Sequence, residues 1–267
     1  MGKKIQISSY LVLLLLTLFA MYMLKDCRHY NVQVDRLRGD SLNVAIEYSP
    51  ISLYMKNDTL YGFNYDLIKE LSIQGGFDIK FHPIVNIKSG LLGINSGSYD
   101  ILLAQIPITA EMRNKYLFTE PIYLDKQVLV QRIDSLGDVV VKSQLDLADK
   151  TVYVISGTST QERINSLAQE IGETIHIVSK HKFGQRELFN MVADSIIDYA
   201  IINEKSAQRL SNDITNVDFK MDISFTQFQS WVINPQDTLL CDSINILIKR
   251  IKETPRYEEI YNRYFIQ

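Results

Sequence analysis

The side chains that could perform chemistry are few and widely spaced along this sequence. Only two of the four histidines, His176 and His181, lie close together, and their spacing of five residues suits neither face of a regular helix. The two cysteines, Cys27 and Cys241, are too few for a disulfide framework or a cysteine-rich zinc site. We therefore expect neither a metalloenzyme nor a bound cofactor.

The other candidate groups favour binding over catalysis. A carboxylate acid or base could come from Glu47, Glu111 or Glu204, but nothing in the sequence marks any of them as perturbed, and no Ser-His-Asp or Cys-His set is readable. The Gly-Thr-Ser triplet at 157–159 precedes an amphipathic stretch, so the free N–H groups of a helix N-terminus could receive an anion or a carbonyl oxygen there. Alternatively, its hydroxyl groups simply cap the helix. We expect no enzyme activity.

The charge balance gives the chain no electrostatic reason to bind nucleic acid. The 267 residues include 28 Lys+Arg and 31 Asp+Glu, for a net charge of -3. The proportions of hydrophobic residues, 46%, and charged residues, 22%, are those of a globular protein. The length allows one large domain or two lobes.

The N-terminus is typical of a targeting segment. Lys3 and Lys4 precede the apolar run YLVLLLLTLFAMYML at 10–24, whose 15 residues fall between the length of a cleavable signal and that of a membrane anchor. No small-x-small cleavage site follows, and the charged residues before Cys27 are unlike a lipidation site. We predict an uncleaved signal anchor at 1–24, with a cleaved signal peptide as the alternative, and a polar tether at 25–40. The positive-inside rule places Lys3 and Lys4 in the cytoplasm and the remainder outside it, anchored or secreted.

From residue 41 onward, short apolar runs alternate with amphipathic stretches. The expected strands are 42–48, 78–84, 99–106, 127–133, 151–156, 174–179, 197–203 and 230–234. The expected helices are 65–76, 87–97, 160–172, 185–195 and 243–265, the last of them broken at Pro255. This βαβαβ order occurs twice and predicts two α/β units with parallel strands, so the space between them is the expected ligand site.

Short motifs follow one another in a fixed order along this pattern. They are GFNYDL at 62–67, GSYDI at 97–101, ITAE at 108–111 with FTEPIY at 118–123, LDLA at 145–148, GTS at 157–159 and YEEIYNRYF at 257–265. Together they resemble the motifs of the bacterial extracellular solute-binding proteins of family 3, the type II periplasmic binding proteins that serve polar amino-acid transporters. The resemblance extends from about residue 41 to 267, and the N-terminal domain of membrane-bound lytic transglycosylase F is similar as well.

The resemblance implies an α/β, two-lobed, periplasmic-binding-protein-like (type II) fold with two hinge strands, preceded by an N-terminal hydrophobic helix. Lobe 1 is expected at 41–130 with 228–267, and lobe 2 at 131–227. QVLVQR and SWVIN are the expected hinge crossings. The lobes of this family close on a small ligand, which a permease of the ABC type can then receive.

The resemblance also implies a set of ligand contacts. These are the rings nearest the first loop and their neighbour, Tyr48, Ser52 and Tyr54; then Gln105 and Arg113; and, from the second lobe, Thr158, Ser159 and Asn203.

Three positions depart from the amino-acid binders of the family. The arginine that pairs with the ligand carboxylate aligns with Met112, and Arg113, one residue later, is the nearest replacement. The hydroxyl residue that supports that carboxylate aligns with Pro107, and the acidic residue that receives the ligand ammonium aligns with Asn203. The zwitterion contacts are thus lost together, so we expect a small-molecule ligand that is neutral or singly charged, either an amino-acid-like compound, a peptide or a cell-wall fragment, rather than a standard free amino acid.

Three functions remain open at this point. The first is a solute-binding protein that feeds a transporter or senses a solute. The second is a non-catalytic envelope module related to the N-terminal domain of transglycosylase F, whose catalytic domain would need well over 100 further residues. The third is an enzyme built on the same scaffold, such as the periplasmic dehydratases.

Overall fold

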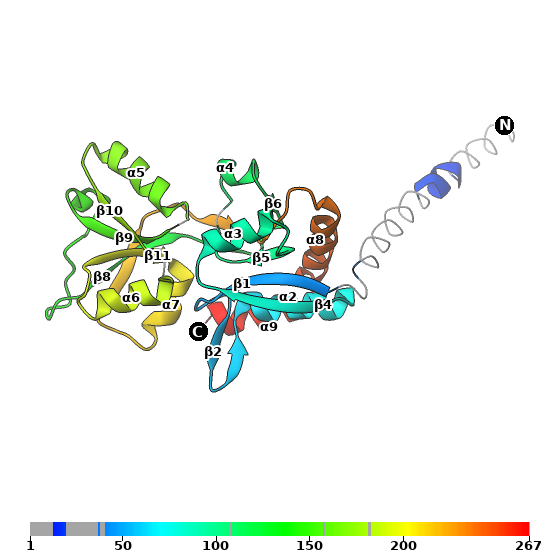
Figure 1. Ribbon diagram of the computed structural model, residues 1–267, viewed down its shortest axis with the longest axis horizontal. Coiled ribbons are helices and arrows are strands. Elements are labelled where there is room, and N and C mark those ends of the chain that lie inside the picture. The colour runs from blue at the N-terminus through cyan, green and yellow to red at the C-terminus, as the bar shows by residue number, and fades with distance from the viewer. Residues whose placement is uncertain are drawn as a thin grey trace, which may run out of the picture.

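The computed structural model describes residues 13–19, 37, 41–106, 108–156, 158–180 and 183–266. Two α/β lobes lie side by side, each with its own five-stranded sheet (Figure 1). This arrangement confirms the two-lobed α/β architecture that the sequence predicts.

The first lobe is built on a sheet in the order β4-β1-β5-β14-β6. Its strands are β1 (Ser41–Glu47), β4 (Asp78–Ile84), β5 (Ile101–Leu103), β6 (Leu117–Phe118) and β14 (Val232–Ile233). β1 pairs in parallel with β4 and β5, as a βαβαβ unit requires, while β14 is antiparallel to β5 and β6. The helices between the parallel strands are α2 (Phe63–Gly75) and α3 (Ile87–Asn95), and the short α4 (Ala110–Arg113) follows β5.

The C-terminal helices complete the first lobe. α8 (Thr238–Lys252) and α9 (Pro255–Phe265) both contact α2, and their apolar faces belong to the same buried cluster as Phe63 and Trp231. Proline at the first position of α9 fixes the break between the two helices, since it lacks the N–H that a helix interior needs. The predicted return of the C-terminal helix pair to the first lobe is confirmed.

The second lobe has a sheet in the order β10-β9-β11-β8-β12. Its strands are β8 (Gln127–Arg132), β9 (Thr151–Ile155), β10 (His176–Lys180), β11 (Tyr199–Asn203) and β12 (Val217–Asp222). Its helices are the 3-10 turn η1 (Gln144–Leu147), α5 (Thr160–Ile171), α6 (Gln185–Ala193) and α7 (Glu204–Ser211). One apolar cluster lies against α6 and α7, and another lies against α5, so helices cover both faces of the sheet.

The two chain crossings between the lobes are β7 (Tyr123–Asp125) and β13 (Gln227–Gln229), which pair with each other outside both sheets. QVLVQR was expected to be a crossing, and that prediction is wrong: β8 pairs with β11 and β12 inside the second sheet. SWVIN likewise ends in β14 of the first sheet rather than in the hinge. Both segments are apolar because they are buried in sheets, whereas the true crossings are shorter and more polar. Residues 127–132 therefore belong to the second lobe; the other predicted lobe limits stay a prediction.

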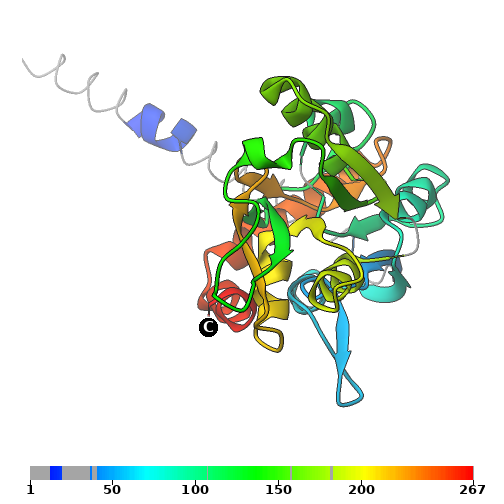
Figure 2. The same cartoon turned by 90° about the vertical axis from the view of Figure 1, so that its left-hand side faces the viewer.

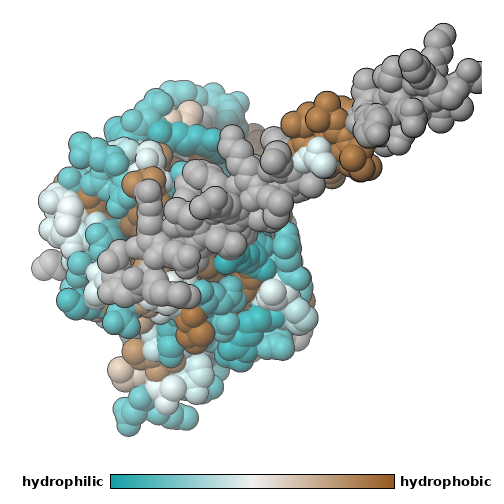
Figure 3. Space-filling view, turned by 90° about the vertical axis from the view of Figure 1, so that its right-hand side faces the viewer, coloured by the Kyte–Doolittle hydropathy of each residue, from teal (hydrophilic) through white to brown (hydrophobic). Residues whose placement is uncertain are grey.

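The N-terminal segment is described only at 13–19 and at Leu37. Residues 13–19 are helical, and the exposed leucine and phenylalanine side chains there form the brown band in Figure 3. None of the helices that the structure describes is long and apolar enough to cross a membrane. The remainder of the predicted anchor at 10–24, its cleavage and Cys27 lie outside the described residues, so those predictions stay open.

A hairpin that the sequence analysis missed projects from the first lobe (Figures 1 and 2). β2 (Tyr54–Lys56) and β3 (Thr59–Tyr61) are joined by Asn57 and Asp58, whose φ angles of 50° and 57° lie in the left-handed region. Two such residues in succession are typical of a type I′ hairpin turn. The Asn-Asp pair is therefore the local signal for this hairpin.

Gly62, which opens the GFNYDL motif, offers a test of this packing. Its φ is 150°, and a Cβ atom would lie 2.2 Å from the backbone oxygen of Ser52. We expect Gly62→Ala to lower the free energy of unfolding by about 3 kcal/mol or more. Gly97→Ala, at φ +71° with nothing within 4 Å of the added Cβ, should cost only about 1 kcal/mol. Urea denaturation of both variants measures the difference; equal losses would contradict the proposed clash.

Candidate functional site between the lobes

Polar side chains from both lobes converge beside the hinge. The first lobe contributes the ends of β1 and β5, the hinge contributes the end of β7, and the second lobe contributes the end of β11 and the first turns of α6 and α7. Strands of α/β sheets place their carboxyl ends at ligand crevices, so this is where the fold favours a site. In the sequence, this region corresponds to short apolar strands that each end in a polar residue.

Gln105, directly after β5, is the central contact between the lobes. Its side-chain oxygen accepts hydrogen bonds from Gln185 Nε2 and Ser206 Oγ, both at 2.7 Å and both from the second lobe. Its Nε2 donates to Asp125 Oδ2 in the hinge at 3.0 Å. Gln105 is only 2% exposed. The predicted ligand residue therefore uses its amide to join the two lobes.

Asp125 is a buried carboxylate that receives donors from both lobes. Oδ2 accepts from Gln105 and, at 3.5 Å, from Asn203 Nδ2, while Oδ1 accepts from the backbone N–H groups of Lys126 and Lys205 at 2.9 and 3.2 Å. Burial raises the pKa of Asp125 to about 7, because the loss of solvation exceeds the stabilisation that these donors give to the charged form. The group therefore titrates near neutral pH.

Glu47, at the end of β1, is a second buried carboxylate in contact with the same glutamine. Its Oε2 accepts from the backbone N–H of Gln105 at 3.1 Å and from Ser52 Oγ at 3.4 Å. Burial raises the pKa of Glu47, and hydrogen bonds from Gln105, Gln185, Ser49 and Ser52 oppose that rise. Two carboxylates held in one desolvated region are the feature that pKa-based site searches associate with function.

The first loop brings two of its three predicted residues to the space between the lobes. Tyr48 is 42% exposed, and its backbone oxygen lies near Gly184, at the start of α6. Tyr54 contacts the second lobe, since its hydroxyl accepts a hydrogen bond from Arg209 at 2.7 Å. Ser52, in contrast, is fully buried and bonds within the first lobe, to Glu47 and to Asn64 Nδ2 at 2.8 Å.

The position aligned with the family's arginine packs against the protein itself. Met112 lies against the buried cluster of the first lobe together with Tyr99 and Phe118. Arg113 is exposed at the end of α4. The one-residue offset between the two positions on the helix therefore directs the methionine side chain toward the core and the arginine side chain toward the surface. Pro107, the third of the changed positions, lies outside the described residues.

At the predicted helix start in the second lobe, only some of the polar side chains hydrogen-bond to other groups of the protein. Thr158 Oγ1 lies 2.9 Å from the backbone oxygen of Ile155 and 3.0 Å from Thr160 Oγ1. Ser159 is the N-cap residue of α5, yet its side chain makes no capping hydrogen bond. The capping interpretation therefore fails for Ser159, and Gly157 lies outside the described residues.

Asn203 ends β11 and joins the Asp125 network rather than standing apart from it. Its backbone N–H donates to Gln185 Oε1 at 3.0 Å. The sequence analysis missed Asp125, Gln185 and Ser206. Asp125 had a detectable signal, an acidic residue between two apolar runs at the lobe boundary, whereas Gln185 and Ser206 are ordinary first-turn residues of their helices.

Two α/β lobes joined by a pair of crossing strands, with polar groups meeting beside the hinge, define the two-lobed binding-protein class. Residues 42–267 match the bacterial extracellular solute-binding proteins, family 3, and the chain belongs to that family.

Two kinds of protein are among the relatives of the chain. Membrane-bound lytic murein transglycosylase F of Pseudomonas fluorescens (strain Pf0-1) is 22% identical over 252 residues, which cover 91% of this chain and 50% of that protein. The chain thus spans about half the length of the transglycosylase relatives. The arginine-binding extracellular protein ArtP of Bacillus subtilis (strain 168) is 23% identical over 226 residues, which cover 84% of this chain and 85% of ArtP.

Solved structures show the same fold. An ancestral arginine-binding protein bound to arginine superposes with a TM-score of 0.74 at 22% identity, covering 86% of this chain and 99% of its own. A structure from work on glutathione import through GshT and the cystine ABC importer of Streptococcus mutans gives a TM-score of 0.75 at 21% identity, covering 85% and 95%.

Asp125→Asn tests the electrostatics of the hinge. Because the folded pKa of Asp125, about 7, lies above its usual value of 3.8, the native state binds the proton more tightly than the unfolded chain. Its contribution to stability is fully present below about pH 4 and is lost as the pH rises through about 7. We expect the wild type to lose on the order of 2 kcal/mol through this group between about pH 5 and 8.

The free energy of unfolding, measured by denaturation at a series of pH values, should lack this part of its pH dependence in Asp125→Asn. Asp138→Asn is the matched control, because its side chain is 67% exposed and should leave the slope unchanged. An unaltered pH dependence in Asp125→Asn would show that Asp125 is ionised throughout.

Proposed function

We propose that the chain is an extracytoplasmic solute-binding protein whose two lobes close on a small ligand beside the hinge. The observation that carries the proposal is the Gln105 network, in which one buried amide joins lobe 1, lobe 2 and the hinge. Closure of the lobes assembles these groups, and opening separates them. A ligand that contacts the same region therefore shifts the balance between the two states by its preference for the closed one.

Family membership supports a location outside the cytoplasm, on the periplasmic side of the cell membrane, with an N-terminal segment that anchors or exports the chain. The arginine-binding and importer-linked relatives support an ABC-type permease as the partner that reads closure. A sensor role uses the same motion with a different partner. The binding function needs no catalytic group of its own, and the transglycosylase relatives owe their names to proteins of about twice this length.

For ligand contacts we propose Tyr48, Ser52, Tyr54, Gln105, Arg113, Thr158, Ser159 and Asn203. Ser159 is the strongest member of the second-lobe group, because its hydroxyl stands at a helix N-terminus without serving as a cap. Gln105 and Asn203 already hydrogen-bond to protein groups, so a ligand that used them would have to replace those bonds.

The ligand that we propose carries at most one charge. A free amino acid would shed water from both its charges, while Met112 is packed into the lobe and Asn203 supplies no negative charge. Asp125 does not replace the lost acid, because four N–H donors already surround it. A small peptide or a cell-wall fragment is consistent with the remaining neutral donors.

The first test is a calorimetric screen of residues 30–267 against the twenty standard amino acids. We expect no dissociation constant below about 10 μM, which corresponds to roughly -7 kcal/mol. Native mass spectrometry of the same protein, purified without refolding, should reveal any retained solute by its mass. Micromolar binding of one amino acid that disappears in Arg113→Ala would contradict the proposal, since Arg113 would then have taken over the carboxylate contact.

A gain-of-function variant sharpens this test. Met112→Arg combined with Asn203→Asp restores the two charges that the family uses for a zwitterion. We expect the double variant to bind at least one amino acid at least tenfold more tightly than the wild type, because each restored ion pair replaces a desolvated, unpaired charge. Either single substitution is the matched control. No gain in the double variant would mean that the packed position of residue 112 or another part of the site excludes amino acids.

The second candidate is a non-catalytic envelope module that binds a peptidoglycan fragment. The similarity to transglycosylase F over most of the chain favours it, together with the loss of the zwitterion contacts. Binding of a soluble disaccharide-peptide, without binding of free amino acids, supports this candidate over a transporter component. If neither the disaccharide-peptide nor a free amino acid binds, the envelope-module candidate fails, and the proposed solute-binding protein must take another solute.

A further inference from the structure

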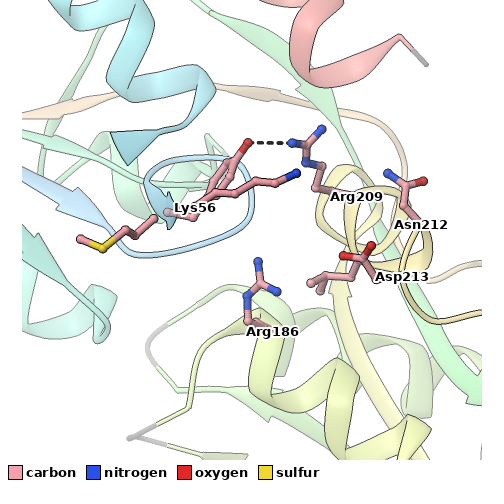
Figure 4. Close-up of a pocket in the computed structure, with 8 residues that line it drawn as sticks. Lys56, Arg186, Arg209, Asn212 and Asp213 are labelled. Atoms are coloured by element: carbon pink, nitrogen blue, oxygen red, sulfur yellow. Dashed lines mark hydrogen bonds between the residues drawn. The ribbon is translucent and has the colours of Figure 1, made fainter. Parts of the chain in front are cut away.

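A pocket lies between the lobes, under the β2–β3 hairpin. Its volume is about 440 Å³, within the usual range of small-molecule sites. The residues that line it are Tyr54, Met55, Lys56, Arg186, Arg209, Leu210, Asn212 and Asp213. The first three come from β2 in lobe 1, and the others come from α6, α7 and the residues after α7 in lobe 2 (Figure 4). None of the eight donates to or accepts from Gln105 or Asp125 through its side chain.

Three cationic side chains surround this pocket. Lys56 reaches in from the hairpin, Arg186 from the first turn of α6 and Arg209 from α7 (Figure 4). Within the described part of the chain, none of the three forms a salt bridge with a carboxylate. Asp213 is the one acidic group in the lining and is not paired with them. The pocket therefore carries an excess of about two positive charges.

Closure of the lobes increases this excess. Both arginines belong to lobe 2, on helices that contact each other, whereas Lys56 belongs to lobe 1 and joins them only when the lobes meet. Arg209 holds Tyr54 from across the interface, with its guanidinium donating to the hydroxyl at 2.7 Å and lying 5.5 Å from the ring centroid. Like charges gathered at an interface oppose closure unless an anion lies among them.

We propose that this pocket binds a small organic anion with at least two negative charges on phosphate or carboxylate groups, and that the bound anion stabilises the closed state. Arg186 and Arg209 present planar guanidinium groups, which bind oxyanions through paired hydrogen bonds, and Lys56 adds a point charge. The volume exceeds that of a single oxyanion group, and the Tyr54 ring, Met55 and Leu210 provide an apolar wall for the rest of the ligand.

The test uses the full chain in mild detergent at constant ionic strength, with no other solute added. The probes are inorganic pyrophosphate, which offers phosphate groups alone, and citrate, which offers carboxylates alone. We expect calorimetry to detect submillimolar binding of at least one probe, and small-angle X-ray scattering to show a smaller radius of gyration when it is bound. Citrate binding alone identifies a carboxylate site, and pyrophosphate binding alone identifies a phosphate site.

The decisive variants are Arg186→Gln and Lys56→Gln, whose side chains are exposed and whose loss should not impair folding. Each should weaken binding of the probe about tenfold or more, since each removes a charge-assisted contact. Lys220→Gln, with a side chain that is 92% exposed on β12, is the matched control and should bind like the wild type.

Two results would overturn the proposal. One is the absence of binding for both probes. The other is equal weakening in Lys220→Gln and in the pocket variants, which would indicate a general charge effect. Because the protein is assayed without its solute, neither result depends on the identity of the ligand beside the hinge.

Discussion

Burial of the Asp125 carboxylate at the hinge is the constraint on which the rest of the interface depends. A charge taken out of water costs several kcal/mol unless protein donors replace the lost solvation. Here the donors come from three places: Gln105 in lobe 1, the backbone of the hinge at Lys126, and Asn203 with Lys205 in lobe 2. Opening the lobes would remove the first donor or the last pair. Because burial nevertheless raises the pKa of Asp125 to about 7, the charged carboxylate is less stable in the closed arrangement than in water, and these donors only reduce that cost.

Gln105 connects that hinge charge to the second lobe. The nitrogen and the oxygen of its amide face different partners. The nitrogen donates to Asp125, and the oxygen accepts from both Gln185 and Ser206. A carboxylate in its place would repel Asp125, and a shorter side chain would not reach both. Gln105, which was expected to contact the ligand, thus joins the lobes and the hinge in this structure.

The sequence predicts the fold well where periodicity is strong. β1, β4, α5 and α9 were expected within a few residues of their bounds, because each buries one regular face against a core. The hinge strands were misplaced for the opposite reason. β7 and β13 are three residues long and pair with each other at the edge of both lobes, so neither shows an alternating pattern. The β2–β3 hairpin was missed because its strands are largely exposed and its only signal is the Asn-Asp turn.

The site was harder to predict than the fold, since its key contacts join residues far apart in sequence. Glu47 was noticed as a carboxylate, but its burial and its bond to Gln105 follow only from the pairing of β1 with β5. Asp125 has an unusual pKa because of what covers it, and nothing in its sequence neighbours reveals that cover. Motif alignment could not show which polar groups the protein satisfies internally.

Helix α7 links the buried network to the cationic pocket. Ser206 and Arg209 are three residues apart and therefore lie on one face of the helix, toward lobe 1. Ser206 bonds to Gln105 beside the hinge, and Arg209 bonds to Tyr54 at the hairpin. α6 also contributes to both places, although through adjacent residues that do not share a face: Gln185 in the network and Arg186 in the pocket. A rotation that separates the lobes moves both helices as rigid units and breaks both sets of contacts together. The hinge carboxylate and the pocket cations would consequently respond to one motion, so ligands bound at the two proposed sites would be coupled through it.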